Sequence, residues 1–103
     1  MAATNNYLIS YDISSNRTRN LLAKLLAKLG CVRWQKSVFV AIDFEKTDLE
    51  QLKTQITRLL ANKTQPTDSV LLVMARDLGN KNCFLMGKYT AFDPDDTIIV
   101  WQK

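Results

Sequence analysis

The feature that most constrains the fold of this chain is the order in which strand-like and helix-like apolar patterns follow one another. The first pattern, Tyr7–Asp12, alternates in part and is rich in aromatic and branched residues, which is typical of a β-strand. From about residue 16 to residue 29, leucines recur at the spacing of one helix face, at Leu22, Leu25, Leu26 and Leu29. This spacing predicts an amphipathic helix, and Gly30 is its expected terminator.

Two further strand-like runs follow, at residues 32–37 and 38–42, and they are interpreted as two strands or as one bent ribbon. Thr47 and Glu50 have the spacing of a capping box, which predicts that a second helix begins there with Thr47 as its N-cap. An apolar run at residues 70–74 predicts a fourth strand.

The resulting order, β-α-β-β-α-β, predicts an α+β fold of the ferredoxin-like type. In that fold a four-stranded antiparallel sheet carries both helices on one face. Apolar pieces at residues 83–86 and 97–101 predict one or two short extra strands in a C-terminal extension that begins at about residue 76. The chain has 103 residues and no repeat or linker, so residues 1–103 are expected to form a single domain.

Histidine is absent from the sequence. Its absence excludes the Ser/His/Asp triad, the Cys/His dyad, a His-ligated zinc site and a histidine general base, so any catalysis depends on carboxylates, a metal, or Lys and Tyr. Cys31 and Cys83 cannot form a Cys-only zinc site and are interpreted as reduced core residues. No signal peptide or apolar run of the ~20 residues that span a bilayer is found, so a cytoplasmic protein without a membrane partner is expected.

Positive charge is concentrated in the first part of the chain. Residues 1–40 hold six basic side chains and one acidic one, Asp12, whereas residues 41–103 hold eight basic and nine acidic side chains. The six basic residues are Arg17, Arg19, Lys24, Lys28, Arg33 and Lys36. Such a bias is compatible with a polyanionic partner, and equally with a solvated helix face.

Asp12 ends the first predicted strand and has two interpretations. A carboxylate at this place can bind a hard cation such as magnesium, which takes one or two carboxylates and fills its other positions with water and phosphate oxygens. In the structural interpretation, Asp12 caps the loop or the first helical turn through Ser14 and Ser15. One carboxylate per chain is a poor magnesium site unless a second chain supplies another.

Arg17 and Arg19 open the first predicted helix close to Asp12, where arginine forks and the helix N-terminus both favour phosphate. Arg33 and Lys36 flank Trp34, a combination that suits nucleic acid. For Trp34 itself, a core or interface position is favoured over base stacking.

Taken together, these residues resemble the small CRISPR-associated adaptation proteins of the "Cas two" family. The resemblance covers about residues 7–75 and is carried by an ordered set of residues, of which no single motif is specific. The set is Tyr11-Asp12-Ile13, then Arg17 and Arg19, Gly30, the run Arg33-x-Gln35-x-Ser37-Val38-Phe39, and Asp68-Ser69-Val70. Many family members carry an acid after the Ser-Val-Phe run, where this chain has Val40.

The resemblance implies a homodimer that takes part in spacer acquisition, binds duplex DNA and bridges two dimers of the CRISPR integrase. It also implies a metal-dependent endonuclease of RNA or DNA, in which Asp12 of both subunits shares one Mg²⁺ or Mn²⁺ and is the catalytic residue. The family's last strand often packs on the neighbouring subunit, and residues 97–101 are the candidate here. An alternative from another class is a single-strand RNA-binding module of the RNP type, but Lys36–Ala41 lacks the glycines and paired aromatics of that module.

Overall fold

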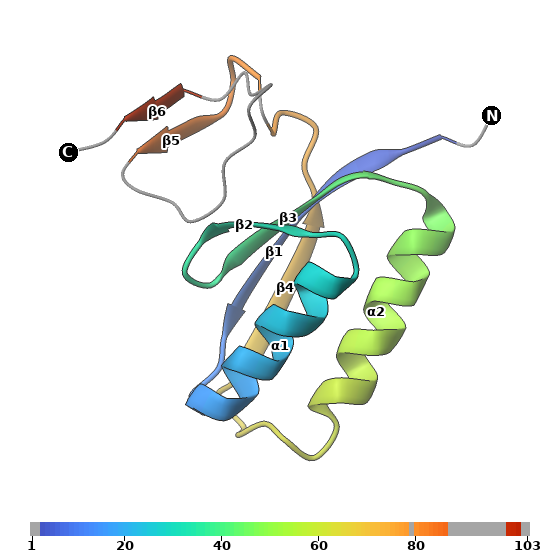
Figure 1. Ribbon diagram of the computed structural model, residues 1–103, viewed down its shortest axis with the longest axis vertical. Helices are drawn as coiled ribbons and strands as arrows, with labels where there is room; N and C mark the ends of the chain where they lie inside the picture. The colour runs from blue at the N-terminus through green and yellow to red at the C-terminus, as the bar shows by residue number, and fades with distance from the viewer. Residues whose placement is uncertain (1–2, 79, 87–98, 102–103) are drawn as a thin grey trace.

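The structure is a computed structural model, and it describes residues 3–78, 80–86 and 99–101. The elements follow the predicted order (Figure 1). They are β1 (Asn5–Asp12), α1 (Asn16–Lys28), β2 (Val32–Gln35), β3 (Val38–Phe44), α2 (Lys46–Leu60), β4 (Ser69–Met74), β5 (Phe84–Met86) and β6 (Ile99–Trp101).

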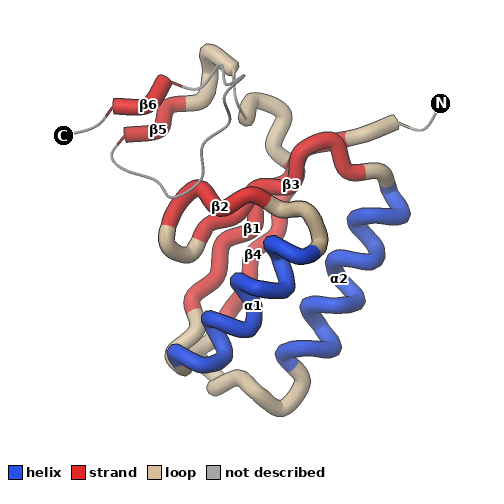
Figure 2. The backbone as a smooth tube through the Cα atoms, in the orientation of Figure 1, coloured by secondary structure: helices blue, strands red, loops and turns tan. Residues whose placement is uncertain are grey.

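The first four strands form one antiparallel sheet in the order β2-β3-β1-β4, so β1 and β3 are central and β2 and β4 are edges. Both helices pack side by side on the same face of this sheet (Figures 1 and 2). This arrangement confirms the predicted ferredoxin-like α+β fold.

Alternation along the strands divides their side chains between the two faces of the sheet. Tyr7, Ile9 and Tyr11 of β1 point toward the helices and are buried. They join the helix-facing core, whose other fully or nearly fully buried members include Ile13, Leu22, Leu26, Phe39, Ala41 and Leu52. Each fully buried aliphatic side chain contributes about 2 kcal/mol through removal from water.

The opposite face of the sheet, called the open face below, carries no helix (Figure 1). Trp34 and Val40 are buried there, with Leu78 and Cys83 packed against them. Other apolar side chains of this face stay accessible: Leu71 is 58% exposed, Ile42 42% and Val73 40%. The open face is therefore apolar and only partly covered.

Two local features differ from or refine the expectations. The bent-ribbon alternative is replaced by two strands, because the chain turns at Lys36–Ser37 and the register shifts between Arg33 and Gln35. The helix that was predicted to begin with Thr47 as N-cap begins instead at Lys46 with Glu45 as N-cap, so that prediction was wrong. The backbone N–H of Glu45 donates to the Asp48 carboxylate at 2.9 Å, and the Glu45 carboxylate accepts from the Asp48 backbone N–H. This capping box satisfies two free N–H groups at the helix start, and it begins two residues before the predicted one.

Gly30 lies just beyond α1 with φ of +95°, a left-handed conformation that only glycine adopts without strain. Gly30 therefore ends α1, as predicted.

In the C-terminal extension, β5 and β6 pair in parallel as a separate two-stranded sheet. Residues 97–98 of the predicted last strand lie outside the described residues, and packing of this piece on a second subunit remains a prediction. Among the described residues, no helix is long and apolar enough to cross a membrane.

Candidate functional site

Four segments meet where β1 ends, and this region is called the β1 end below. Asp12 lies opposite Ser69, the first residue of β4. The backbone N–H of Tyr11 donates to the carbonyl of Ser37 in the β2–β3 turn at 3.1 Å. A loop of three residues, 13–15, then leads into α1. The antiparallel pairing thus gathers Asp12, the β2–β3 turn, the start of β4 and the start of α1 at one edge of the sheet.

The Asp12 side chain is exposed, and alternation with buried Tyr11 directs it to the open face. Within the described part of the chain, its carboxylate takes part in no hydrogen bond or ion pair, so it does not cap the loop or the helix. A free, exposed carboxylate fits the oxygen chemistry that magnesium prefers. The described residues of one chain contain no group of three or more His, Cys, Asp or Glu side chains suited to a metal, so Asp12 fits as one ligand and not as a complete site.

A different aspartate, Asp68, holds the loop after Asp12. Its Oδ1 accepts from the backbone N–H of Ser14 at 3.0 Å and its Oδ2 from the N–H of Gln65 at 2.9 Å. These hydrogen bonds, that of Gln65 first, lower the pKa of Asp68 below its ordinary value. Sequence reasoning noted Asp68 only as part of the resemblance. The turn at Pro66 was the local signal that its carboxylate would bond nearby backbone, but the contact with Ser14 spans 54 positions.

The start of α1 is fixed by Ser15, whose hydroxyl accepts from the Thr18 N–H at 3.2 Å as the N-cap. Arg19 bends back onto the loop, and its Nη1 donates to the carbonyls of Ile13 at 2.7 Å and Ser14 at 3.2 Å. The Arg19 guanidinium is therefore engaged with backbone carbonyls of the loop.

Arg33 lies on the helix side of the sheet in a small aromatic cluster. Its guanidinium lies 5.5 Å from the Phe39 ring centroid and donates to the Lys36 carbonyl, which holds the β2–β3 turn. Phe39 in turn stacks with Tyr11 at 6.4 Å between ring centroids. Burial raises the pKa of Tyr11, although the nearby Arg33 and Arg19 act in the opposite direction. The Tyr11 phenol is thus kept protonated and is not a base at neutral pH.

The remaining basic residues predicted to bind nucleic acid have exposed side chains: Arg17, Lys24, Lys28 and Lys36. In the part of the chain that the structure describes, none of these four side chains forms a hydrogen bond or an ion pair. The first turn of α1 contains no acid. The outer face of α1 accordingly carries a stripe of positive charge that starts at the β1 end.

Trp34 and the cysteines have structural positions. Trp34 is 8% exposed and packs against Val40, as the core interpretation predicted. Cys31 is buried in the helix-facing core, and burial raises its pKa to about 11, so its thiol stays protonated and unreactive at neutral pH.

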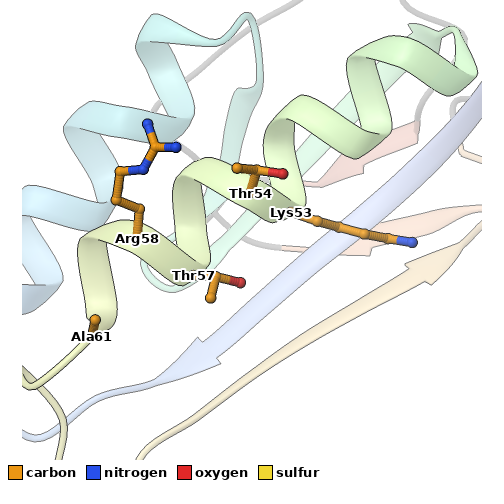
Figure 3. Close-up of a pocket in the computed structure, with 5 residues that line it drawn as sticks. All are labelled: Lys53, Thr54, Thr57, Arg58 and Ala61. Carbon is orange, nitrogen blue, oxygen red and sulfur yellow. The ribbon is translucent and has the colours of Figure 1, made fainter.

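A hollow of about 480 Å³ lies along the C-terminal half of α2 (Figure 3). Its lining residues come from α2 and from Ala61, the C-cap of this helix, and the Lys53 and Arg58 side chains extend in different directions. Lys53 is paired with Glu50 at 3.3 Å. The hollow is therefore a gap between surface side chains of one helix and adds nothing to the site around Asp12.

Comparison with known proteins decides the family. The family model described as "CRISPR associated protein Cas2" matches residues 5–81, about three quarters of the chain. The chain belongs to the Cas2 family. A crystal structure of a hypothetical protein, TT1823, from Thermus thermophilus is 30% identical, with a TM-score of 0.60, over 70% of this chain and 82% of the other. Among curated proteins, none matches.

Membership of the Cas2 family confirms the resemblance and extends it from about residue 75 to residue 81, past the end of β4. A CRISPR-associated role follows from membership. The departure at Val40 also has a structural explanation, because Val40 is completely buried beside Trp34 on the open face. A carboxylate at this position would be buried among apolar side chains, which disfavours its charged form.

Proposed function

We propose that this Cas2 chain works as a homodimer that binds duplex DNA during spacer acquisition and bridges two dimers of the CRISPR integrase. The observation that supports DNA binding best is a set of exposed cations on α1 and in the β2–β3 turn that form no ion pair among the described residues. These are Arg17, Lys24, Lys28 and Lys36. Exposed cations that form no ion pair are what a phosphate backbone binds.

The dimer is supported by the open face. Leu71, Val73 and Ile42 are each at least 40% exposed on one side of a single sheet. Contiguous apolar surface of this kind is typical of protein–protein contacts. A second copy seated on the open face covers these side chains and brings a second Asp12 toward the same contact.

Duplex binding is tested by fluorescence anisotropy over a range of salt concentrations. Arg17→Ala should weaken binding for every sequence tested and should lower the slope of log K against log[salt] by about one per lost phosphate contact. Lys46→Ala is the matched control, since it removes an exposed cation at the start of α2, at the opposite end of the sheet. An unchanged slope in Arg17→Ala would count against this surface.

As a second function we propose metal-dependent cleavage of RNA or DNA phosphodiesters. Asp12 from both subunits would hold one Mg²⁺ or Mn²⁺, which when bound supplies Lewis acidity toward a phosphoryl oxygen. The exposed Asp12 carboxylate supports this function, and the engaged Arg19 and Arg33 keep the surrounding backbone in place.

The nuclease is tested with Asp12→Asn in the presence of magnesium or manganese. Cleavage should fall by about 100-fold or more. Losses of this size follow the removal of one hydrogen-bond donor that stabilises the charge developing in a transition state. Cleavage that persists in the mutant would remove Asp12 from the mechanism.

Base stacking on the sheet, as in RNP-type modules, is not supported. Such modules need aromatic side chains on the open face of the two central strands. Here Tyr7 and Tyr11 of β1 and Phe39 of β3 belong to the core that faces the helices. Trp34, on an edge strand, is buried.

A further inference from the structure

The peptide unit between Ile13 and Ser14 is held at both of its polar ends. Its carbonyl accepts from Arg19 Nη1 at 2.7 Å, and its N–H donates to Asp68 Oδ1 at 3.0 Å. A peptide unit is planar, so holding both groups fixes the orientation of the whole plane. This plane is the first one after Ile13 and lies between Asp12 and the N-cap of α1.

Asp68 is itself fixed where it stands. Its second carboxylate oxygen accepts from the Gln65 N–H at 2.9 Å, and its own backbone N–H donates to the Gln65 carbonyl at 2.9 Å. The next residue, Ser69, is paired with Asp12 in the sheet. Asp68 therefore joins a rigid turn to the loop that separates Asp12 from Arg17.

We propose that Asp68 is a positioning residue: by holding the Ser14 N–H it sets the placement of Asp12 and Arg17 relative to each other, and so the way the β1 end meets a phosphate backbone. The proposal rests on the proposed DNA-binding function. Asp68 is distinct from the residues that would touch the nucleic acid. It acts on them by fixing the orientation of the Ile13–Ser14 peptide.

Replacement of Asp68 changes DNA affinity in opposite directions through its charge and through its positioning role. The sign of the change therefore shows whether the positioning role exists. Asp68→Asn removes a negative charge near a surface that binds phosphate, and by electrostatics alone this change tightens DNA binding. It also places an amide NH₂ against one of two backbone N–H groups, so one of the hydrogen bonds is lost. Loss of positioning therefore weakens binding although the chain becomes more positive.

The experiment measures the affinity of the full-length protein for a labelled DNA duplex over a range of salt concentrations. For Asp68→Asn we expect affinity to fall by about three- to tenfold and the salt slope to decrease by about one, because a phosphate contact is lost. Asp77→Asn is the charge control, since Asp77 is an exposed aspartate whose Oδ1 accepts a local hydrogen bond from the Asn80 amide at 3.2 Å. Its affinity should stay the same or rise.

Thr18→Val is the structural control. The Thr18 hydroxyl donates to the Lys63 carbonyl at 3.3 Å. The variant therefore removes a different hydrogen bond between α1 and the α2–β4 connection and keeps both hydrogen bonds of the Ile13–Ser14 peptide. Affinity within twofold of wild type is expected. A loss as large as that of Asp68→Asn would overturn the proposal, because general loosening would then explain both.

Binding by Asp68→Asn that equals or exceeds wild type, while Arg17→Ala weakens it, overturns the positioning role and leaves the proposed function standing. If Arg17→Ala also has no effect, this surface is not the one that binds DNA, and the positioning role fails with it. Asp68→Glu gives a second variant with unchanged net charge in case Asp68→Asn does not fold. Its longer side chain moves the carboxylate away from Ser14, so it too should weaken binding, and wild-type affinity in a folded Asp68→Glu would contradict the proposal.

Discussion

Asp12 and Asp68 lie at the same edge of the sheet, yet their carboxylates have opposite surroundings. Asp12 is exposed and, among the described residues, unbonded, whereas both oxygens of Asp68 accept backbone N–H groups. The first is free to bind a ligand and the second holds the structure. The sequence indicated that a carboxylate could cap this loop, and the structure assigns that task to Asp68 instead of Asp12.

The lowered pKa of Asp68 predicts a pH-dependent contribution to stability. A carboxyl whose pKa is lower in the folded state than in the unfolded state stabilises the fold above its unfolded pKa, about 4, and loses this contribution as pH falls through the folded pKa. The difference in melting temperature between wild type and Asp68→Asn should therefore be largest at pH 6 and should shrink toward pH 3. A difference that stays constant over this range would show that the charge of Asp68 does not stabilise the fold.

At the scale of elements, the start of α2 shows how one helix signal can be displaced by another. Thr47 and Glu50 have the expected spacing, but Glu45 and Asp48 form the box that the structure uses. The chain must leave β3 directly after Phe44, which is buried, and Asp43 takes a left-handed φ of 57° to turn it. Because the chain turns at Asp43, α2 begins at Lys46, only two residues after the end of β3.

This cap is tested by two alanine substitutions in adjacent residues. Asp48→Ala should lower the free energy of unfolding by about 1 kcal/mol, the usual effect of losing a helix cap, whereas Thr47→Ala should change it by less than about 0.5 kcal/mol. Urea unfolding followed by circular dichroism measures both. Equal losses, or a larger loss in Thr47→Ala, would favour the original placement of the cap.

Most of the element order could be predicted because it depends on local periodicity. The leucine stripe of α1 and the terminator Gly30 follow from spacing and from the demands of a left-handed φ. Contacts that join distant segments could not be predicted in this way. The bond from Ser14 to Asp68 spans 54 positions and depends on strand order and register, which no local pattern contains.

At the scale of the whole molecule, the two faces of the sheet have different tasks. The helices cover one face and bury its apolar side chains. The open face carries exposed apolar side chains, and Asp12 lies on this same face. A single chain offers one free carboxylate there and no cluster of metal ligands among its described residues. Two chains that meet through the open face give the proposed function both its paired carboxylates and its two cationic stripes.

The dimer interface is tested with a pair of substitutions in β4. Leu71→Lys places a charge on the open face and should convert the proposed dimer to monomer, raising the dissociation constant by at least about 100-fold, since the proposed interface would then bury two charges. Met74→Lys is the matched control, because Met74 is 54% exposed but pairs with Tyr7 on the helix side. Sedimentation equilibrium measures both, and equal dissociation of the two variants would contradict an interface on the open face.

Native mass spectrometry of the protein with a short DNA duplex tests the central proposal most directly, because it counts chains and duplexes in one complex. Wild type should give two chains bound to one duplex, and Leu71→Lys should give free monomer with little DNA bound. One chain per duplex in the wild type, or a Leu71→Lys monomer that binds DNA as well as the wild type does, would contradict a functional unit of two chains.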